Sequence, residues 1–138
     1  MMPLHKCKDF YCKVFTEDTD FQGVVYHANY LKYFERARSE FLHFHQLSQV
    51  TSHENNGAYV VKDLTLNFYF PAKLENNLVV KSEIQLASKA RMEFTQEIWE
   101  QKNDIILCSG KVNVCYINTL TGKPRSFPDE LLTLIGIS

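Results

Sequence analysis

A single change of hydrophobic period, near residue 58, constrains the fold more than any other feature of the chain. Before it, apolar side chains in residues 27–46 recur every three or four positions, which is the period of an α-helix. After it, apolar and polar side chains alternate, which is the period of a β-strand. The predicted order is therefore one long helix followed by four consecutive strands. These four strands are predicted over residues 59–70, 78–87, 92–100 and 105–117.

The two ends of the chain complete this order. Residues 7–16 are rich in Phe, Tyr, Val and Thr, which predicts a first strand. A short helix is expected over residues 128–134, because proline is common at helix starts. No repeat or linker-like segment interrupts the sequence, so a single domain is expected over residues 1–138.

Two details of the strands are predicted from their side chains. Gly110, inside the last strand, is expected to mark a β-bulge or a point where another element crosses closely. In residues 59–70 one line of apolar side chains is expected to share a single face of the sheet. This line consists of Val60, Leu64, Leu66, Phe68 and Phe70.

The packing of one helix on several strands predicts an α+β fold with a curled sheet. Consecutive strands joined by short turns favour antiparallel pairing. A helix of ~10–12 Å diameter cannot cover about five strands spaced ~4.8 Å apart unless the sheet curls around it. The other face and the edges of the sheet would remain uncovered. We therefore expect a homodimer or a larger assembly.

The overall composition excludes several functional classes. The net charge of −1 gives no general attraction to nucleic acid or to an anionic membrane. No segment approaches the ~20 apolar residues of a membrane-spanning helix. The four cysteines form no C-x-x-C pair, and the first residues do not resemble a signal peptide. A reduced, cytoplasmic protein is expected.

An acidic turn directly before the long helix is the main candidate site. Asp20 could supply a base or a nucleophile, and Gly23 permits the backbone to approach a ligand closely. The free N–H groups and the dipole of the following helix could stabilise a developing oxyanion. A carboxylate beside an oxyanion site suits acyl transfer. The alternative, in which Asp20 only forms a turn or caps the helix, stays open.

Other polar residues near this turn have less specific interpretations. His27 could polarise a carbonyl group, or its ring could simply bond the backbone of the first helical turn. Glu35 and Arg38 are expected to pair along the helix, with Glu35 only a minor catalytic candidate. Residues 18–29 begin like a calcium-binding loop but end on Asn29 instead of a bidentate Glu. No metal site is predicted.

The run EDTDFQGVVYHANYLKYFERAR, residues 17–38, resembles the signature of the hotdog-fold acyl-CoA thioesterases of the 4-hydroxybenzoyl-CoA thioesterase family. It is most similar to the bacterial branch associated with the Tol–Pal system. The segments FTQEI (94–98) and GKPRSFPDEL (122–131) also match that branch in order and spacing. The resemblance implies a hotdog fold, in which one long helix is wrapped by a curled antiparallel sheet of about five strands. It also implies hydrolysis of an acyl-CoA substrate without a cofactor, by a homodimer or homotetramer with sites at the subunit interfaces.

The resemblance also implies roles for individual residues. Asp20 corresponds to the catalytic carboxylate of the family, and the backbone amide of His27 corresponds to the donor that polarises the thioester carbonyl. Gly23 and Tyr26 are expected to contact the substrate. Whether Asp20 attacks directly or activates water stays open, and so does the acyl group that the enzyme prefers.

Four cations are candidates for binding the phosphates of CoA. Lys89 and Arg91 lie in a turn between two predicted strands, and Lys123 and Arg125 lie in a loop after the last strand. A chain of net charge −1 needs such local clusters to hold a strongly anionic ligand. Surface charge without a ligand is the equally weighted alternative.

Two functions compete with thioester hydrolysis. The chain could be a non-catalytic module that binds acyl-CoA or acyl carrier protein, but such a module has no need of the Asp20 carboxylate. It could also be a hydratase on the same scaffold, but the sequence shows no separate acid–base pair for that reaction. The sequence therefore favours the thioesterase.

Overall fold

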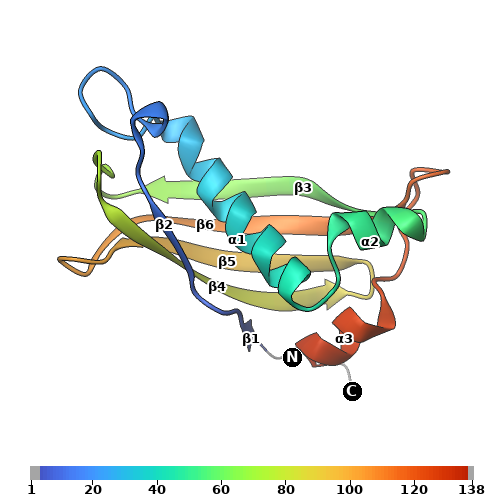
Figure 1. The fold of residues 1–138 in the computed structure, drawn as a ribbon. Helices are drawn as coiled ribbons and strands as arrows, with labels where there is room; N and C mark the ends of the chain where they lie inside the picture. Colours follow the sequence, from blue (N-terminus) through green and yellow to red (C-terminus); the bar gives the residue numbers. More distant parts are fainter. Residues whose placement is uncertain (1–3, 137–138) are drawn as a thin grey trace.

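The computed structural model describes residues 4–136 of the chain as a curled antiparallel sheet with one long helix lying across it (Figure 1). The sheet has six strands in the order β1-β4-β5-β6-β3, and β2 pairs with β4 beside this path. The strands are β1 (His5–Lys6), β2 (Phe10–Lys13), β3 (Gly57–Phe68), β4 (Asn77–Ser88), β5 (Arg91–Glu100) and β6 (Ile105–Asn118). The helices are α1 (Tyr30–Phe44), α2 (Gln49–Glu54) and α3 (Asp129–Ile135), with short 3₁₀ turns η1 (Thr16–Asp18) and η2 (His27–Asn29).

The predicted hotdog architecture is confirmed, with two differences. The strand expected over residues 7–16 is shorter, β2 at Phe10–Lys13, and another short strand, β1, precedes that range; both pair with β4. The helix α2 was not predicted, because its sequence is polar. It begins where the Ser48 hydroxyl accepts a hydrogen bond from the Thr51 amide at 3.4 Å, which caps its first turn.

A β-bulge in β3 overturns the predicted apolar face of that strand. Val61 pairs with Val114, but Asp63 pairs with the next residue of β6, so Lys62 is an extra residue. Because side chains alternate along a strand, one extra residue moves the following side chains to the opposite face. Val60 therefore points to the outer face, and the prediction that it shares a face with Leu64 is wrong. The inward line is Tyr59, Val61, Leu64, Leu66 and Phe68.

A buried glutamine holds α1 on the sheet. The side chain of Gln96, in β5, has no exposed surface. Its Nε2 donates to the Phe34 carbonyl at 3.1 Å and to the Ser82 hydroxyl at 3.0 Å, and its Oε1 accepts from Arg38 Nη1 at 3.0 Å. Arg38 thus reaches across to the sheet instead of forming the pair predicted with Glu35, whose Oε1 accepts from the Ser39 hydroxyl.

Gly110, in β6, packs tightly against β3 and lies beneath α1. A Cβ atom there would lie 2.7 Å from Leu66 Cδ2, 3.0 Å from the Thr65 carbonyl oxygen and 3.5 Å from Phe34 Cε2. Phe34 of α1 is at ordinary contact distance, so a close crossing of the helix at Gly110 stays a prediction, and the tight neighbours lie in β3. The extra residues of the register shifts are Lys62 in β3, Ala87 in β4 and Leu107 in β6, so the bulge expected at Gly110 lies elsewhere.

The helix leaves the inner face of β3 largely uncovered. Val61, Leu64 and Phe68 point to the helix side of the sheet, yet their side chains remain 41%, 37% and 51% exposed. The edge strand thus presents apolar side chains together with an unpaired backbone edge. Both are features of a surface that pairs with another strand.

The tight packing at Gly110 can be tested by adding a methyl group. Gly110→Ala should lower the free energy of unfolding by about 1–3 kcal/mol, because the new Cβ would meet the Leu66 side chain and the Thr65 carbonyl oxygen. Denaturant unfolding measures the change. Lys111→Ala, on the neighbouring outward and exposed position, should change stability by less than about 0.5 kcal/mol. Equal effects of the two variants would contradict the tight packing at Gly110.

Candidate active site

The acidic turn lies at the end of the molecule where α1 begins (Figure 1). The chain leaves β2, forms η1 and then folds back on itself, with a β-bridge between Thr19 and Val25. The Asp20 amide donates to the Val24 carbonyl at 2.9 Å, and the Tyr26 amide donates to the Asp18 carbonyl at 3.3 Å. This small hairpin carries Asp20 at its tip and leads directly into η2 and α1.

The two aspartates of the turn have different environments. Asp18 is only 7% exposed. Its Oδ2 accepts from the Phe15 amide at 2.9 Å, and its Oδ1 accepts from Asn29 Nδ2 at 3.1 Å. Asp18 therefore ties the turn to the start of the helix. Asp20 is exposed, and its two hydrogen bonds, from the Gln22 and Val24 amides at 2.8 and 3.4 Å, both fall on Oδ1.

Gly23 is needed for the shape of this tip. Its φ of +76° lies in the left-handed region, which residues with a side chain rarely adopt. Its amide donates to the Asp20 carbonyl at 3.1 Å, and its carbonyl accepts from Leu74 in the β3–β4 connection at 2.8 Å. The turn is thus fixed by glycine and held against a second segment.

The helix start supplies free backbone donors beside the turn. Tyr26 is extended, with φ −61° and ψ 135°, and the helical conformation begins at His27. Within residues 4–136, the hydrogen bonds of this segment leave the His27 amide without an acceptor. The exposed His27 ring packs on the Tyr26 ring, with centroids 4.3 Å apart, and not on the backbone of the first turn.

Apolar and aromatic side chains surround the turn. The Tyr30 hydroxyl accepts from the Ala72 amide at 2.9 Å, and the Tyr30 ring contacts the Phe68 ring at a centroid distance of 5.4 Å. These contacts hold the β3–β4 connection against the helix start. The exposed members of the group are Phe15, Phe21, Tyr26, Phe68, Tyr69, Phe70 and Leu74. Such a surface can take an apolar ligand or another protein chain.

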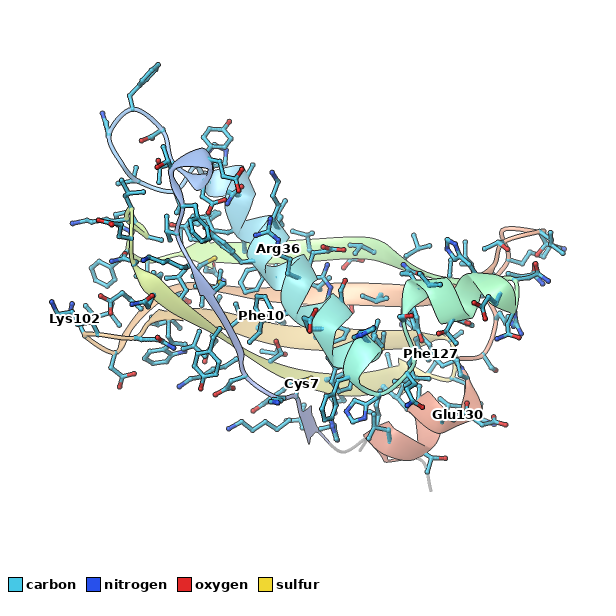
Figure 2. All side chains as sticks on the ribbon, viewed as in Figure 1. Cys7, Phe10, Arg36, Lys102, Phe127 and Glu130 are labelled. Atoms are coloured by element: carbon cyan, nitrogen blue, oxygen red, sulfur yellow. The ribbon has the colours of Figure 1, made fainter. Side chains whose placement is uncertain are left out.

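The two segments that carry the candidate cations, the β4–β5 turn and the loop between β6 and α3, lie at the opposite end of the sheet, near α2 and α3 (Figure 1). Figure 2 labels Phe127 at this end. The structure brings the two segments together, because the Phe127 amide donates to the Lys89 carbonyl at 2.7 Å. These two segments do not lie near the turn that carries Asp20 in the same chain. Arg125 donates to the Asn55 carbonyl and lies over the Tyr116 ring, 5.9 Å from its centroid.

Two cavities at this end were not predicted from the sequence. Arg91 lines a depression of about 290 Å³ together with Asp63 and Glu93. A larger cavity of about 540 Å³ lies between α2 and residues 125–130, and Arg125 lines it. Its walls come from segments far apart in the sequence, so no local motif could have indicated it.

Other chemistries find little support in the described part of the chain. No group of three or more His, Cys, Asp or Glu side chains that could hold a metal ion occurs in residues 4–136. Burial raises the pKa of the Cys7 and Cys108 thiols to about 12 and that of Cys12 to about 11, which disfavours the reactive thiolate. Among these residues, no helix is long and apolar enough to cross a membrane.

Comparison with known proteins gives the class of this chain. Residues 14–135 match the family model of the Thioesterase-like superfamily. Acyl-CoA thioester hydrolase YbgC of Escherichia coli O157:H7 is 38% identical over 120 residues, which cover 87% of this chain and 89% of the relative. Acyl-CoA thioesterase YbgC of Helicobacter pylori strain 26695 is 36% identical over 134 residues, with coverages of 90% and 98%.

Solved structures agree with this comparison. A probable thioesterase from Bartonella henselae is 38% identical, with a TM-score of 0.80, and the match covers 88% of this chain and 99% of that chain. A 1,4-dihydroxy-2-naphthoyl-CoA thioesterase from Synechocystis shares the fold at 23% identity, with a TM-score of 0.89 and coverages of 95% and 96%. Fold and family match together define a hotdog thioester hydrolase, as the sequence predicted. The chain belongs to the Thioesterase-like superfamily.

The different roles of Asp18 and Asp20 can be tested by comparing the stabilities of their alanine variants. Asp18→Ala should lower the free energy of unfolding by about 1–3 kcal/mol, because two donors in a buried corner lose their acceptor. Asp20→Ala should change it by less than about 0.5 kcal/mol, because this side chain is exposed. Thermal unfolding of both variants checks the difference. If Asp20→Ala destabilises as much as Asp18→Ala, Asp20 is a structural residue of the turn.

Proposed function

We propose that this protein hydrolyses acyl-CoA thioesters to a free carboxylic acid and CoA. The observation that carries the proposal is the exposed Asp20 carboxylate in a glycine turn that leads straight into a helix start with a free amide. Relatives named as acyl-CoA thioesterases, which are 36–38% identical over nearly the whole chain, support the choice of substrate class.

Catalysis would combine one carboxylate with one backbone donor. The His27 amide, at the positive end of the helix dipole, would donate a hydrogen bond to the thioester carbonyl oxygen and stabilise its growing negative charge. Asp20 would supply an electron pair, either to the carbonyl carbon or to a proton of the attacking water. The C–S bond then breaks, CoA leaves as the thiol, and water provides the hydroxyl of the acid.

A second copy of the chain would complete the substrate site. Gly23 and Tyr26 flank the reacting carbonyl, and the exposed aromatic side chains around them suit an acyl group. The β4–β5 turn and the loop after β6, whose cations are Lys89, Arg91, Lys123 and Arg125, lie at the far end of the same chain. If two β3 edges pair antiparallel about a two-fold axis, the Asp20 end of one copy lies beside the cationic end of the other.

Removing the Asp20 charge tests the chemistry. Asp20→Asn keeps the size of the side chain but removes the base or nucleophile, so kcat should fall at least ~10²-fold while the melting temperature stays unchanged. Release of free thiol from short, long and aromatic acyl-CoAs measures turnover. Glu17→Gln, the neutralisation of a neighbouring exposed carboxylate, is the matched control and should retain full activity. An active Asp20→Asn variant, or a wild type that binds but never hydrolyses these thioesters, would indicate a binding module.

The assembly can be tested on the uncovered strand. Light scattering at micromolar concentration should show a dimer or a larger species, and Leu64→Asp should shift it toward the monomer and lower turnover, because a charge on this face opposes its burial. Leu4→Asp, at a 60% exposed apolar position beside β1 at the opposite edge of the sheet, should change neither. A fully active monomeric wild type would contradict the shared site.

A further inference from the structure

A cavity of about 200 Å³ lies between the middle of α1 and the edge of the sheet, apart from the acidic turn. Its floor is apolar and buried, and is formed by Met92, Phe94 and Val114. Val61, on the uncovered part of β3, forms one side, and Arg38 of α1 lies at the polar rim. Gln49 also lines it, but both ends of its amide already bond the backbone of Tyr59.

The guanidinium of Arg38 is poorly paired for a half-buried charge. Arginine carries five N–H donors. Within residues 4–136, the one hydrogen bond of this side chain is that from Nη1 to Gln96 Oε1, at 3.0 Å. Glu35, also on the rim, is exposed and accepts from the Ser39 hydroxyl at 3.3 Å. Burial lowers the pKa of Arg38, and the Glu35 charge only partly opposes this effect.

A desolvated cation without a bound anion is unfavourable, and proteins normally pair such groups. The planar fork of arginine matches a carboxylate, to which it can donate two parallel hydrogen bonds. The apolar floor suits the hydrocarbon body of the same ligand and disfavours a fully hydrated anion such as phosphate. The volume is below the ~300 Å³ at which pockets for drug-sized ligands begin, so the ligand must be small.

We propose that this cavity binds the carboxylate of a small organic acid, with Arg38 holding the carboxylate and the floor of Met92, Phe94 and Val114 holding its apolar body. Arg38 follows His27 by 11 residues, roughly 16 Å along a helix. An acid in the cavity therefore lies clear of the acidic turn. If the proposed function holds, the acid is either a released product or the free carboxyl end of an acyl group.

Direct binding tests the cavity without any turnover. In the wild type, hexanoate and benzoate should shift the NMR signal of the Met92 methyl group, whereas the matched neutral amides hexanamide and benzamide should not. Arg38→Met should weaken binding of the acids at least ~10-fold, because a charge-assisted hydrogen bond is lost. Arg36→Met, at an exposed arginine on the same helix, should leave it unchanged. Equal binding of amides, unchanged binding by Arg38→Met, or no effect on Met92 would overturn the proposal.

Arg38→Met also removes a hydrogen-bond partner of Gln96, so loss of binding in that variant could result from a folding defect. A second variant separates the two causes. Val61→Phe fills the cavity from the edge strand, where the side chain is 41% exposed, and leaves the Arg38–Gln96 hydrogen bond in place. It should abolish binding of hexanoate in a protein that stays folded, and light scattering shows separately whether the change at this face also alters assembly. Retained binding in a folded Val61→Phe protein would place the acid elsewhere and refute the proposal.

Turnover then identifies the source of the acid. Tetradecanedioyl-CoA and tetradecanoyl-CoA both have fourteen-carbon acyl groups, long enough to reach from the helix start to Arg38, but only the first ends in a free carboxylate. A preference for tetradecanedioyl-CoA that disappears in Arg38→Met identifies the end of the acyl group. Inhibition of hexanoyl-CoA hydrolysis by hexanoate, lost in the same variant, identifies the released acid. A wild type that hydrolyses no thioester defeats the proposed function, while the binding experiment still decides the cavity.

Discussion

The hydrogen bonds of the buried Gln96 side chain fix the position of the helix, and the candidate site depends on them. Its partners lie in α1 and in β4, so one amide joins the helix to two neighbouring strands. A buried amide costs free energy unless all its hydrogen bonds are made, so other placements of the helix would be penalised. Gly110 packs beside these partners, in contact with Leu66 of β3 and with Phe34 of the helix. The direction of α1 then brings its free amides to the acidic turn.

The elements that could be predicted are those that long periodic segments specify. The helix and the four long strands each bury a continuous line of side chains, and the period of that line is visible in the sequence. The bulge at Val61 was hidden because Val60 and Val61 are both apolar, so either could continue the line. Helix α2 was hidden because it depends on contacts outside itself, in particular the bonds from Gln49 to the backbone of Tyr59 in β3.

In the candidate site, too, some features could be predicted from the sequence and others could not. Asp20, Gly23 and His27 are close in sequence, so a local pattern could indicate them. The structural role of Asp18 could not be read from that pattern, because it depends on the surroundings of each carboxylate. The position of Arg125 and the partner of Arg38, which lies 58 residues away, depend on how the whole sheet is paired. Such relations follow from the fold and not from neighbouring residues.

The uncovered inner face of β3 connects the parts of this molecule. A single helix covers the middle of the sheet and leaves the edge strand open, because its width is smaller than that of the sheet. The same strand walls the Arg38 cavity through Val61 and reaches the helix start through Phe68. A second copy bound to this edge would therefore border both places. Assembly, acyl binding and binding of a small acid would then share one surface, and a substitution there would affect them together.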